Sequence, residues 1–389
     1  MNITDLALQR KKYPHLSDEE WRFMLQQAEG RQRTQDKLPG IAEKDDWWYP
    51  ARISCEQSSS EATAYLKTTL LPTTPYQLID LTGGMGIDTY YLSDKASEAH
   101  YIEQNAELCR LATHNMQLYR PQVEVHHTTA EEYLQHPNIH PNTTTIVYID
   151  PARRNTQGGK VYRIEDCEPN LTTLMPKMKT VASFIMIKLS PMLDITAAIR
   201  TLGEALEVYI IAVENEVKEV LLTLDNTTEK TGQQKSRITT INIKHYDHRT
   251  QQIVADRQEW EMENEKTTPS PQPTDLESDI YLYEPNAAIL KAGAYKLLAE
   301  RYGLKKMSQH THLYTSEKRC EDFPGRVWRI MSVYDKKKHK DIRAGILTRN
   351  YPLSAEELRK KLKIKDSHQY TIIGARVGDK PMLLVAEKL

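Results

Sequence analysis

A glycine-rich turn that directly follows an apolar strand is the feature that most constrains this chain. In segment 77–88, QLIDLTGGMGID, the apolar run ends at Asp80, a glycine turn follows, and a helical pattern then begins. The three glycines are Gly83, Gly84 and Gly86. Glycine suits this place because a ligand must approach the backbone closely and the helix must pack tightly under the strand. The turn therefore predicts a nucleotide site at the end of a strand.

Short apolar runs alternate with helical patterns around this turn. We expect strands at 77–81, 100–103, 123–126, 145–150, 184–188 and 207–213. Strands that are separated by helices imply a parallel sheet with crossover helices. The pattern therefore predicts an α/β fold.

Breaks in the hydrophobic pattern divide the chain into segments. Ser17 and Glu20 have the spacing of a helix capping box, and Ser354 and Glu357 repeat it in the last part of the chain. The stretch TTPSPQPT is rich in proline and almost uncharged, as is typical of a linker. The predicted parts are a helical segment at 1–57, an α/β domain at 58–265, a linker at 266–278 and a smaller α+β domain at 279–389. The α/β domain is expected to begin with a helix at 58–70. The α+β domain is expected to contain a helix near 287–302 and strands near 327–333 and 370–375.

Charge is distributed unevenly along the chain. The whole sequence has 52 Lys plus Arg and 53 Asp plus Glu, for a net charge of −1. Residues 281–389 hold 23 basic and 12 acidic residues, so this part carries +11 and the rest carries −12. Such a basic domain predicts a polyanionic partner, because cations near phosphates release counterions. Its densest basic cluster consists of Lys336, Lys337, Lys338, Lys340, Arg343 and Arg349.

Nothing in the sequence indicates a membrane segment, an export signal or a metal site. The longest apolar runs are strand-sized, far below the roughly 20 residues that cross a bilayer. The charged start, 1–12, is not followed by an apolar export segment. The four cysteines are far apart and form no Cys-x-x-Cys pair, so we expect reduced thiols without a metal. The expected location is the cytoplasm.

A carboxylate closes the strand that follows the glycine turn. Glu103 lies about twenty residues beyond Gly83, where an acid can accept hydrogen bonds from both hydroxyls of a ribose. A dinucleotide site would read G-x-G-x-x-G, whereas this turn reads G-G-M-G and places Asp80 where a phosphate would lie. An acid there favours a ligand with a cationic ammonium group, namely S-adenosylmethionine. A nicotinamide-dependent oxidoreductase is the minor alternative.

These residues resemble the class I S-adenosylmethionine-dependent methyltransferases over about 58–224. The resemblance implies a Rossmann-like sheet, and it implies that five loop residues hold the methionine part of the cofactor: Asp80, Thr82, Gly83, Gly84 and Gly86. It also implies that Glu103 holds the ribose. The position that often carries an adenine-binding Asp is Thr129 here, which leaves either the Ala130 backbone or the residue Glu131 to contact adenine.

The motif DPARR ends the fourth expected strand. It lies where methyltransferases of exocyclic base amines carry [DNS]-P-P-[YFW], in which the acid and the next carbonyl orient the amine and an aromatic ring stacks on the base. Asp150 and Pro151 match that pattern, and the following residues depart from it. Arg153 or Arg154 can instead bind a phosphate, and Tyr162 can supply the stacking ring. The structural alternative is that Asp150 only caps the next turn.

A second arrangement relies on lysines. Lys188 ends the fifth expected strand and Glu214 ends the sixth; with Lys67 and Asp150 they give the order Lys, Asp, Lys, Glu. This order resembles the tetrad of ribose 2′-O-methyltransferases, in which a lysine beside a carboxylate can help deprotonate a hydroxyl. Chance agreement is the alternative, since these residue types are common. Lys188 is expected at the site in either case, because ligands bind at the carboxyl ends of such strands.

The C-terminal part completes a second resemblance. The chain resembles a group of bacterial methyltransferases with a THUMP-like C-terminal domain, which are distantly similar to trimethylguanosine synthases. The segments that carry this resemblance are DLTGGMGID, DPARR, KLSPML, YEPNAAILKAG, FPGRVWRI and IIGARVGDKPMLLVAEKL. THUMP domains bind RNA, so the resemblance implies an RNA substrate. Arg343 and Arg349 are the expected contacts. Tyr314, Trp328 and Tyr351 lie beside arginines, as on an RNA-binding face, with core packing as the alternative and the favoured one for Trp328.

We therefore predict an S-adenosylmethionine-dependent RNA methyltransferase whose reaction site contains Asp150, Pro151 and Lys188. The expected acceptor is a base, such as an exocyclic guanine or adenine amine, with a ribose hydroxyl as the alternative. A protein that binds RNA and cofactor without catalysis is the other function class. It stays open because DPARR lacks the aromatic residue and Thr129 replaces the expected acid.

Overall fold

The computed structural model describes residues 10–153, 164–202, 207–227, 237–277 and 280–389. The chain forms two compact units. The first comprises Met1–Glu214, Lys218–Gln234 and Ile243–Ala255, and the second comprises Asn215–Val217, Lys235–Asn242 and Asp256–Leu389. No helix among the described residues combines the length and the apolar character that crossing a bilayer requires.

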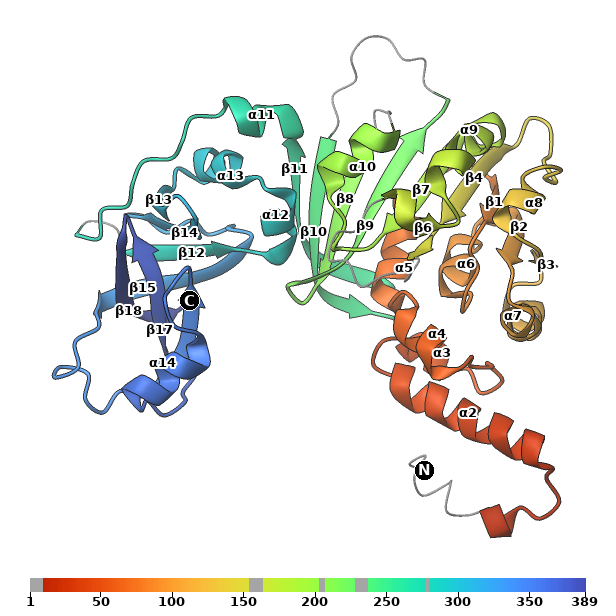
Figure 1. Ribbon diagram of the computed structural model, residues 1–389, viewed down its shortest axis with the longest axis horizontal. Helices are drawn as coiled ribbons and strands as arrows, with labels where there is room; N and C mark the ends of the chain where they lie inside the picture. Colours follow the sequence, from red (N-terminus) through yellow and green to blue (C-terminus); the bar gives the residue numbers. More distant parts are fainter. Residues whose placement is uncertain (1–9, 154–163, 203–206, 228–236, 278–279) are drawn as a thin grey trace. The chain divides into compact units, whose positions relative to one another are not determined.

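A nine-stranded sheet has the order β11-β10-β8-β9-β7-β4-β1-β2-β3 (Figure 1). Its strands are β1 (Tyr76–Asp80), β2 (Ala96–Glu103), β3 (Val123–His127), β4 (Thr144–Ile149), β7 (Phe184–Leu189), β8 (Glu207–Val213), β9 (Glu216–Asp225), β10 (Arg237–Asp247) and β11 (Gln252–Glu261). Strands β3, β2, β1, β4 and β7 pair in parallel, and β9 pairs with β7 in the antiparallel direction. The predicted α/β fold with a Rossmann-like sheet is confirmed.

All six strands predicted for the α/β domain are present, as β1, β2, β3, β4, β7 and β8. The sequence did not predict β9, β10 and β11. Strand β9 begins with the charged run EVKE, and β10 alternates Thr, Asn and Lys with isoleucine, so neither shows the continuous apolar run of the central strands. Continuous apolar runs therefore identify the parallel strands and β8, whereas the strands without such runs, including β9 between β7 and β8, were not predicted.

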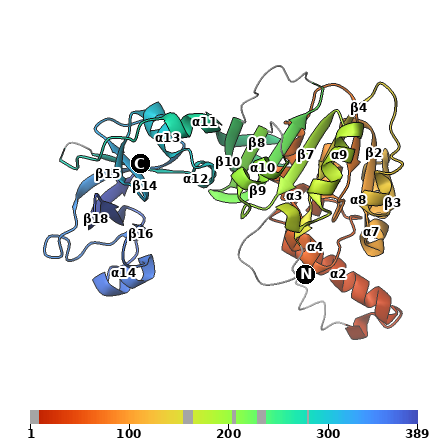
Figure 2. The same ribbon diagram turned by 45° about the horizontal axis from the view of Figure 1, so that its top comes forward.

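Helices connect and cover these strands. They are η1 (Arg10–Lys12), α2 (Asp18–Thr34), α3 (Pro39–Ala42), α4 (Arg52–Gln57), α5 (Glu61–Thr68), α6 (Ile87–Leu92), α7 (Ala106–Tyr119), α8 (Ala130–Tyr133), η2 (Ile164–Asp166), α9 (Leu171–Val181) and α10 (Ile195–Leu202). Both views place α9 and α10 beside the β7–β8 part of the sheet (Figures 1 and 2). The predicted capping box of Ser17 and Glu20 starts α2, and the helix predicted at 58–70 is the shorter α5, capped by Ser60. A short hairpin, β5 (Ala152–Arg153) and β6 (Cys167–Glu168), follows β4.

The second unit contains a seven-stranded sheet of order β13-β14-β12-β15-β18-β17-β16. Its elements are α11 (Met262–Thr267), β12 (Tyr281–Pro285), α12 (Ala287–Ala292), α13 (Tyr295–Tyr302), β13 (Lys305–Ser308), β14 (Thr311–Ser316), β15 (Gly325–Val333), β16 (Gly345–Arg349), α14 (Ala355–Leu362), β17 (Tyr370–Val377) and β18 (Lys380–Lys388). The single helix predicted near 287–302 is two helices, because Gly293 has a φ of 73° and ends α12. The capping box of Ser354 and Glu357 is confirmed at α14.

The proline-rich stretch 267–274 lies in the second unit. Pro273 forms a parallel bridge with Lys306 of β13, and the backbone N–H of Lys306 donates to the carbonyl of Gln272 at 2.8 Å. The stretch is therefore attached to the second sheet along part of its length.

Candidate functional site

The glycine turn packs directly on a tyrosine ring. A side-chain carbon at Gly83 would lie 2.1 Å from the ring of Tyr101, so this position has no room for a larger residue. Gly84 and Gly86 have φ values of 55° and 83°, in the left-handed region that favours glycine. The Tyr101 hydroxyl donates to the carbonyl of Gly84 at 2.6 Å. The turn is thus fixed by the Tyr101 ring beneath it, and the close approach of a ligand to its glycines stays a prediction.

Asp80 ties the turn to the helix that follows. Its side chain is fully buried at the end of β1. One carboxylate oxygen accepts from the backbone N–H of Thr82 at 3.0 Å, and the other accepts from the hydroxyl of Thr89 at 2.5 Å. Burial raises the pKa of Asp80 to about 7. The observed role of this acid is to hold the loop, and its attraction for a ligand ammonium stays a prediction.

Glu103 lies beside the turn, as expected for the acid at the end of β2. It accepts from the backbone N–H of Gly84 at 3.0 Å and from that of Asn105 at 2.8 Å. Asn105 in turn caps the first N–H groups of α7. The structure therefore brings the predicted ribose-binding acid to the predicted cofactor loop.

Thr129 is a helix cap. Its hydroxyl accepts from the backbone N–H of Glu132, and the Glu132 carboxylate accepts from the N–H of Thr129, which forms a capping box at α8. Ala130 is the first residue of this helix and is buried. The first backbone N–H groups of a helix have no partner within the helix. This end of α8 can therefore offer backbone donors to adenine even though the expected Asp is missing.

Asp150 and Lys188 form an ion pair at the ends of two neighbouring strands, β4 and β7. The Lys188 ammonium donates to one Asp150 oxygen. Burial alone would lower the pKa of Lys188, but Asp150, Asp88 and Glu219 together raise it. The backbone N–H of Asp150 donates to the hydroxyl of Thr82 at 2.6 Å, so the glycine loop and this ion pair are directly connected.

A second buried cation lies next to this pair. The Lys67 ammonium, with no exposed side-chain surface, donates to Ser59 at 3.0 Å, Asp88 at 2.8 Å and Glu219 at 3.0 Å. Burial alone would raise the pKa of Asp88, but Lys67 and Lys188 lower it to about 2. Burial raises the pKa of Glu219. Sequence reasoning missed both acids, although Asp88 is the second residue after the last glycine of the turn.

The expected tetrad needs a correction. Glu214 is exposed in the turn after β8, and the buried acid at Lys67 is Glu219 of β9. The antiparallel β9 lies between β7 and β8, so an acid of β9 occupies the position that Glu214 was expected to fill.

The rest of the DPARR motif is only partly described. Pro151 is buried directly after β4, and Arg153 lies in the hairpin strand β5. Arg154 and Tyr162 lie outside the described residues, so their predicted roles with the substrate stay predictions.

The basic residues of the second unit differ in their surroundings. Lys336, Lys337, Lys338, Lys340 and Arg343 are exposed between β15 and β16. Arg349 instead forms an ion pair with the buried Glu284, which Arg326 also contacts. Tyr314 and Trp328 belong to the core, with 0% and 2% exposure, so the RNA-binding face predicted for Tyr314 is wrong and the core packing favoured for Trp328 is confirmed. Trp328 packs in an apolar cluster with Leu282 and Leu384, and the Tyr314 hydroxyl donates to the carbonyl of Tyr295 at 3.1 Å. Tyr351 packs against Gly374.

Comparison with known proteins shows which domain families the second unit matches and which protein family the whole chain belongs to. Residues 281–324 match a ferredoxin-like domain model, and residues 325–388 match a THUMP domain-like model. A provisionally assigned methyltransferase from Porphyromonas gingivalis W83 is 34% identical over 96% of this chain and 92% of that chain, with a TM-score of 0.82. The chain belongs to the family of this protein. Family membership confirms the predicted combination of a class I methyltransferase fold with a THUMP-like C-terminal part.

Other matches are more distant. An rRNA methylase from Streptococcus thermophilus is 12% identical over 42% of this chain and 94% of that chain, with a TM-score of 0.32. A provisionally assigned methyltransferase from Streptococcus mutans, in complex with SAH, is 12% identical over 41% of this chain and 94% of that chain, also with a TM-score of 0.32. A comparison with curated proteins found no match.

Replacing Asp80 by Asn tests the buried acid of the loop. A carboxyl whose pKa is raised to about 7 on folding stabilises the protein at low pH, and this contribution is lost as pH rises towards 7 and above. Asn stays neutral at every pH. We therefore expect the melting temperature of the wild type, relative to Asp80→Asn, to fall between pH 5 and pH 8. A difference that does not change with pH would contradict the raised pKa.

Replacing Lys67 by Met tests the buried cation. The change leaves Asp88 and Glu219 buried without their cation, so the free energy of unfolding should fall by about 3–5 kcal/mol. Adding Glu219→Gln to Lys67→Met should restore part of the loss, because it removes one unpaired charge. Denaturant unfolding gives these values, with the exposed Lys95→Met as a control expected within about 0.5 kcal/mol of wild type. An equally small effect of Lys67→Met would show that the cluster does not stabilise the fold.

Proposed function

We propose that this protein is an S-adenosylmethionine-dependent methyltransferase that acts on RNA. The observation that carries the proposal is the hydrogen bond from the Asp150 backbone to the Thr82 hydroxyl, at 2.6 Å. It connects the turn suited to a nucleoside cofactor with the charged pair at the end of the next strand. A cofactor on the turn would therefore present its reactive group near Asp150 and Lys188. The provisional methyltransferase assignment of the P. gingivalis relative agrees with this reading.

The residues of the turn fit such a cofactor. At Gly84 the nearest atom to an added side-chain carbon is the Thr82 carbonyl oxygen at 3.8 Å, so the backbone is open to a ligand there. Gly84, Gly86 and Thr82 would hold the methionine part, Glu103 would accept from the ribose hydroxyls, and the start of α8 at Ala130 would face the adenine. The cofactor, when bound, supplies the methyl group. The protein's own contribution is to orient the acceptor and to exclude water from it.

Asp150 is the residue best placed to hold the acceptor. Its side chain is 33% exposed, and Lys188 occupies only one of its two carboxylate oxygens. The other oxygen can accept a hydrogen bond from an exocyclic base amine and so fix the direction of its lone pair. Pro151 stiffens the backbone at this point, because its ring fixes φ. The leading candidate acceptor is therefore a base amine.

A ribose hydroxyl is the second candidate, because Lys67 is paired with Glu219 and Lys188 with Asp150 in one charged cluster. Lys188 and Glu219 lie on the same face of the paired strands β7 and β9. A lysine that stays protonated beside three carboxylates is poor at removing a proton. It can instead stabilise the negative charge that develops on a hydroxyl oxygen during attack.

RNA is the proposed substrate class because of the second unit. Its net charge of +11 over 281–389 and its exposed lysines at 336–338 and 340 provide the electrostatic attraction that a phosphate backbone requires. The THUMP domain-like match over 325–388 supports the same class.

Asp150→Ala tests the proposed reaction site. Incubation of total RNA with labelled cofactor should give transfer by the wild type and a loss of about 100-fold or more for Asp150→Ala, since positioning is removed. The exposed Asp36→Ala is the matched control and should transfer label at the wild-type rate.

Mass analysis of nucleosides from the labelled RNA identifies the acceptor in the same experiment. A base methylated on its exocyclic amine supports the base amine as acceptor, and a 2′-O-methylated nucleoside supports the ribose hydroxyl as acceptor. Binding of cofactor and RNA without any transfer would contradict the enzyme and favour a binding protein.

A further inference from the structure

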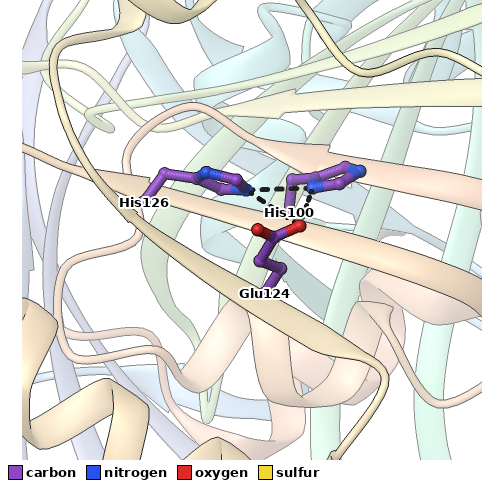
Figure 3. Close-up of side chains that lie close together, drawn as sticks. All are labelled: His100, Glu124 and His126. Carbon is purple, nitrogen blue, oxygen red and sulfur yellow. Dashed lines mark hydrogen bonds and ion pairs between the residues drawn. The ribbon is translucent and has the colours of Figure 1, made fainter.

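Two histidines and a glutamate converge on the part of the sheet formed by β2 and β3 (Figure 3). The Nδ1 atom of His100 lies 3.0 Å from the Nε2 atom of His126. One carboxylate oxygen of Glu124 lies 3.6 Å from each of these two nitrogens. Three atoms that can each donate an electron pair therefore form a nearly equilateral triangle.

The register of two strands creates this triangle. His100 of β2 pairs with Glu124 of β3, so the two side chains are direct neighbours across the ladder. His126 lies two residues beyond Glu124 and points to the same face, because side chains alternate along a strand. The three residues are thus held by backbone pairing. Their arrangement does not rely on a loop.

The spacing matches what a tetrahedral metal ion requires. Bonds of about 2.0–2.1 Å to nitrogen and oxygen at tetrahedral angles separate the ligand atoms by about 3.3–3.4 Å. The observed separations of 3.0, 3.6 and 3.6 Å lie on both sides of that value. A metal ion could therefore be bound with shifts of a few tenths of an ångström in the side chains.

The surroundings also suit a metal site. The Nε2 atom of His100 lies 3.3 Å from Glu98, and metal-bound histidines commonly donate their second ring N–H to a carboxylate. Nε2 also lies 3.0 Å from the amide nitrogen of Gln77, an arrangement in which His100 would carry its proton on Nδ1 and donate to His126. A metal ion at Nδ1 would displace that proton, and His100 would then carry its N–H on Nε2, which faces Glu98.

Access is available from the surface. The side chain of Glu124 is 60% exposed and that of His126 is 23% exposed, whereas His100 is fully buried. An ion can therefore reach the two outer ligands first and then bind the inner one.

We propose that His100, Glu124 and His126 form a binding site for a divalent transition-metal ion, with zinc as the expected occupant. Two imidazoles and one carboxylate are a ligand set that zinc accepts, and three protein ligands leave one position for water. The sequence pointed to no metal because that expectation relied on cysteine spacing, and this cluster contains no cysteine.

The site is separate from the proposed reaction. His100 and Tyr101 are neighbours on β2 and point to opposite faces of the sheet, and Tyr101 lies under the glycine turn. The metal would cross-link β2 and β3 from the face that α8 covers, where the Tyr133 ring lies beside both histidines. Its expected effect is to stabilise these two strands, without a part in methyl transfer.

Zinc titration of the untagged, metal-free full chain tests the site. We expect one equivalent of Zn²⁺ to bind by calorimetry and to raise the melting temperature. His126→Gln and Glu124→Gln should each weaken binding by about tenfold or more. Both residues are partly exposed, so these variants should fold, and circular dichroism checks that they do. Substitution with Co²⁺ should give the intense visible absorption of four-coordinate cobalt.

The control is His127→Gln, which removes the adjacent exposed histidine of the same strand, on the opposite face. It should bind zinc like the wild type. Absence of a stoichiometric zinc site would overturn the proposal, as would unchanged binding in both ligand variants or equal weakening in all three variants. In each of those cases the cluster is only a hydrogen-bonded pair of rings beside a carboxylate.

Discussion

The buried ammonium group of Lys67 is the interaction on which the arrangement of the candidate site depends. Each of its three donors has a partner, and these partners come from the start of α5, the start of α6 and the strand β9. A buried charge is tolerated only when it is fully paired, so the three elements must meet where they do. Lys188 then extends the charged cluster to Asp150, and Asp150 contacts the glycine loop through Thr82. The proposed cofactor loop and the proposed reaction site are thus two ends of one polar network.

This network explains why the first unit combines an apolar sheet with so many buried charges. The central strands supply the apolar core, while their carboxyl ends carry the acids and lysines, at the edge where open α/β sheets bind ligands. The second unit is built differently. Its aromatic residues Tyr314 and Trp328 fill the core, and its positive charge lies on exposed residues between β15 and β16. We propose that chemistry resides in one unit and attraction of RNA in the other.

Sequence reasoning succeeded where the signal is local. The glycine turn, Glu103 and the central strands follow from short patterns whose physical meaning is fixed by neighbouring residues. It failed where the answer depends on which strands lie side by side. Glu219 could not be selected over Glu214 without knowing that β9 lies between β7 and β8, and the histidine cluster follows from a register that no linear spacing encodes. The capping role of Thr129 was also missed, although Thr129 and Glu132 have the local spacing of a capping box.

The central claim is that the glycine turn binds S-adenosylmethionine with Glu103 at the ribose. Isothermal titration of the purified protein with S-adenosylhomocysteine tests it most directly, together with Glu103→Gln and, as a control, the exposed Glu19→Gln of α2. We expect one binding site per chain, strongly weakened by Glu103→Gln and unaffected by Glu19→Gln. Absence of binding, or binding that is unaffected by Glu103→Gln, would contradict it.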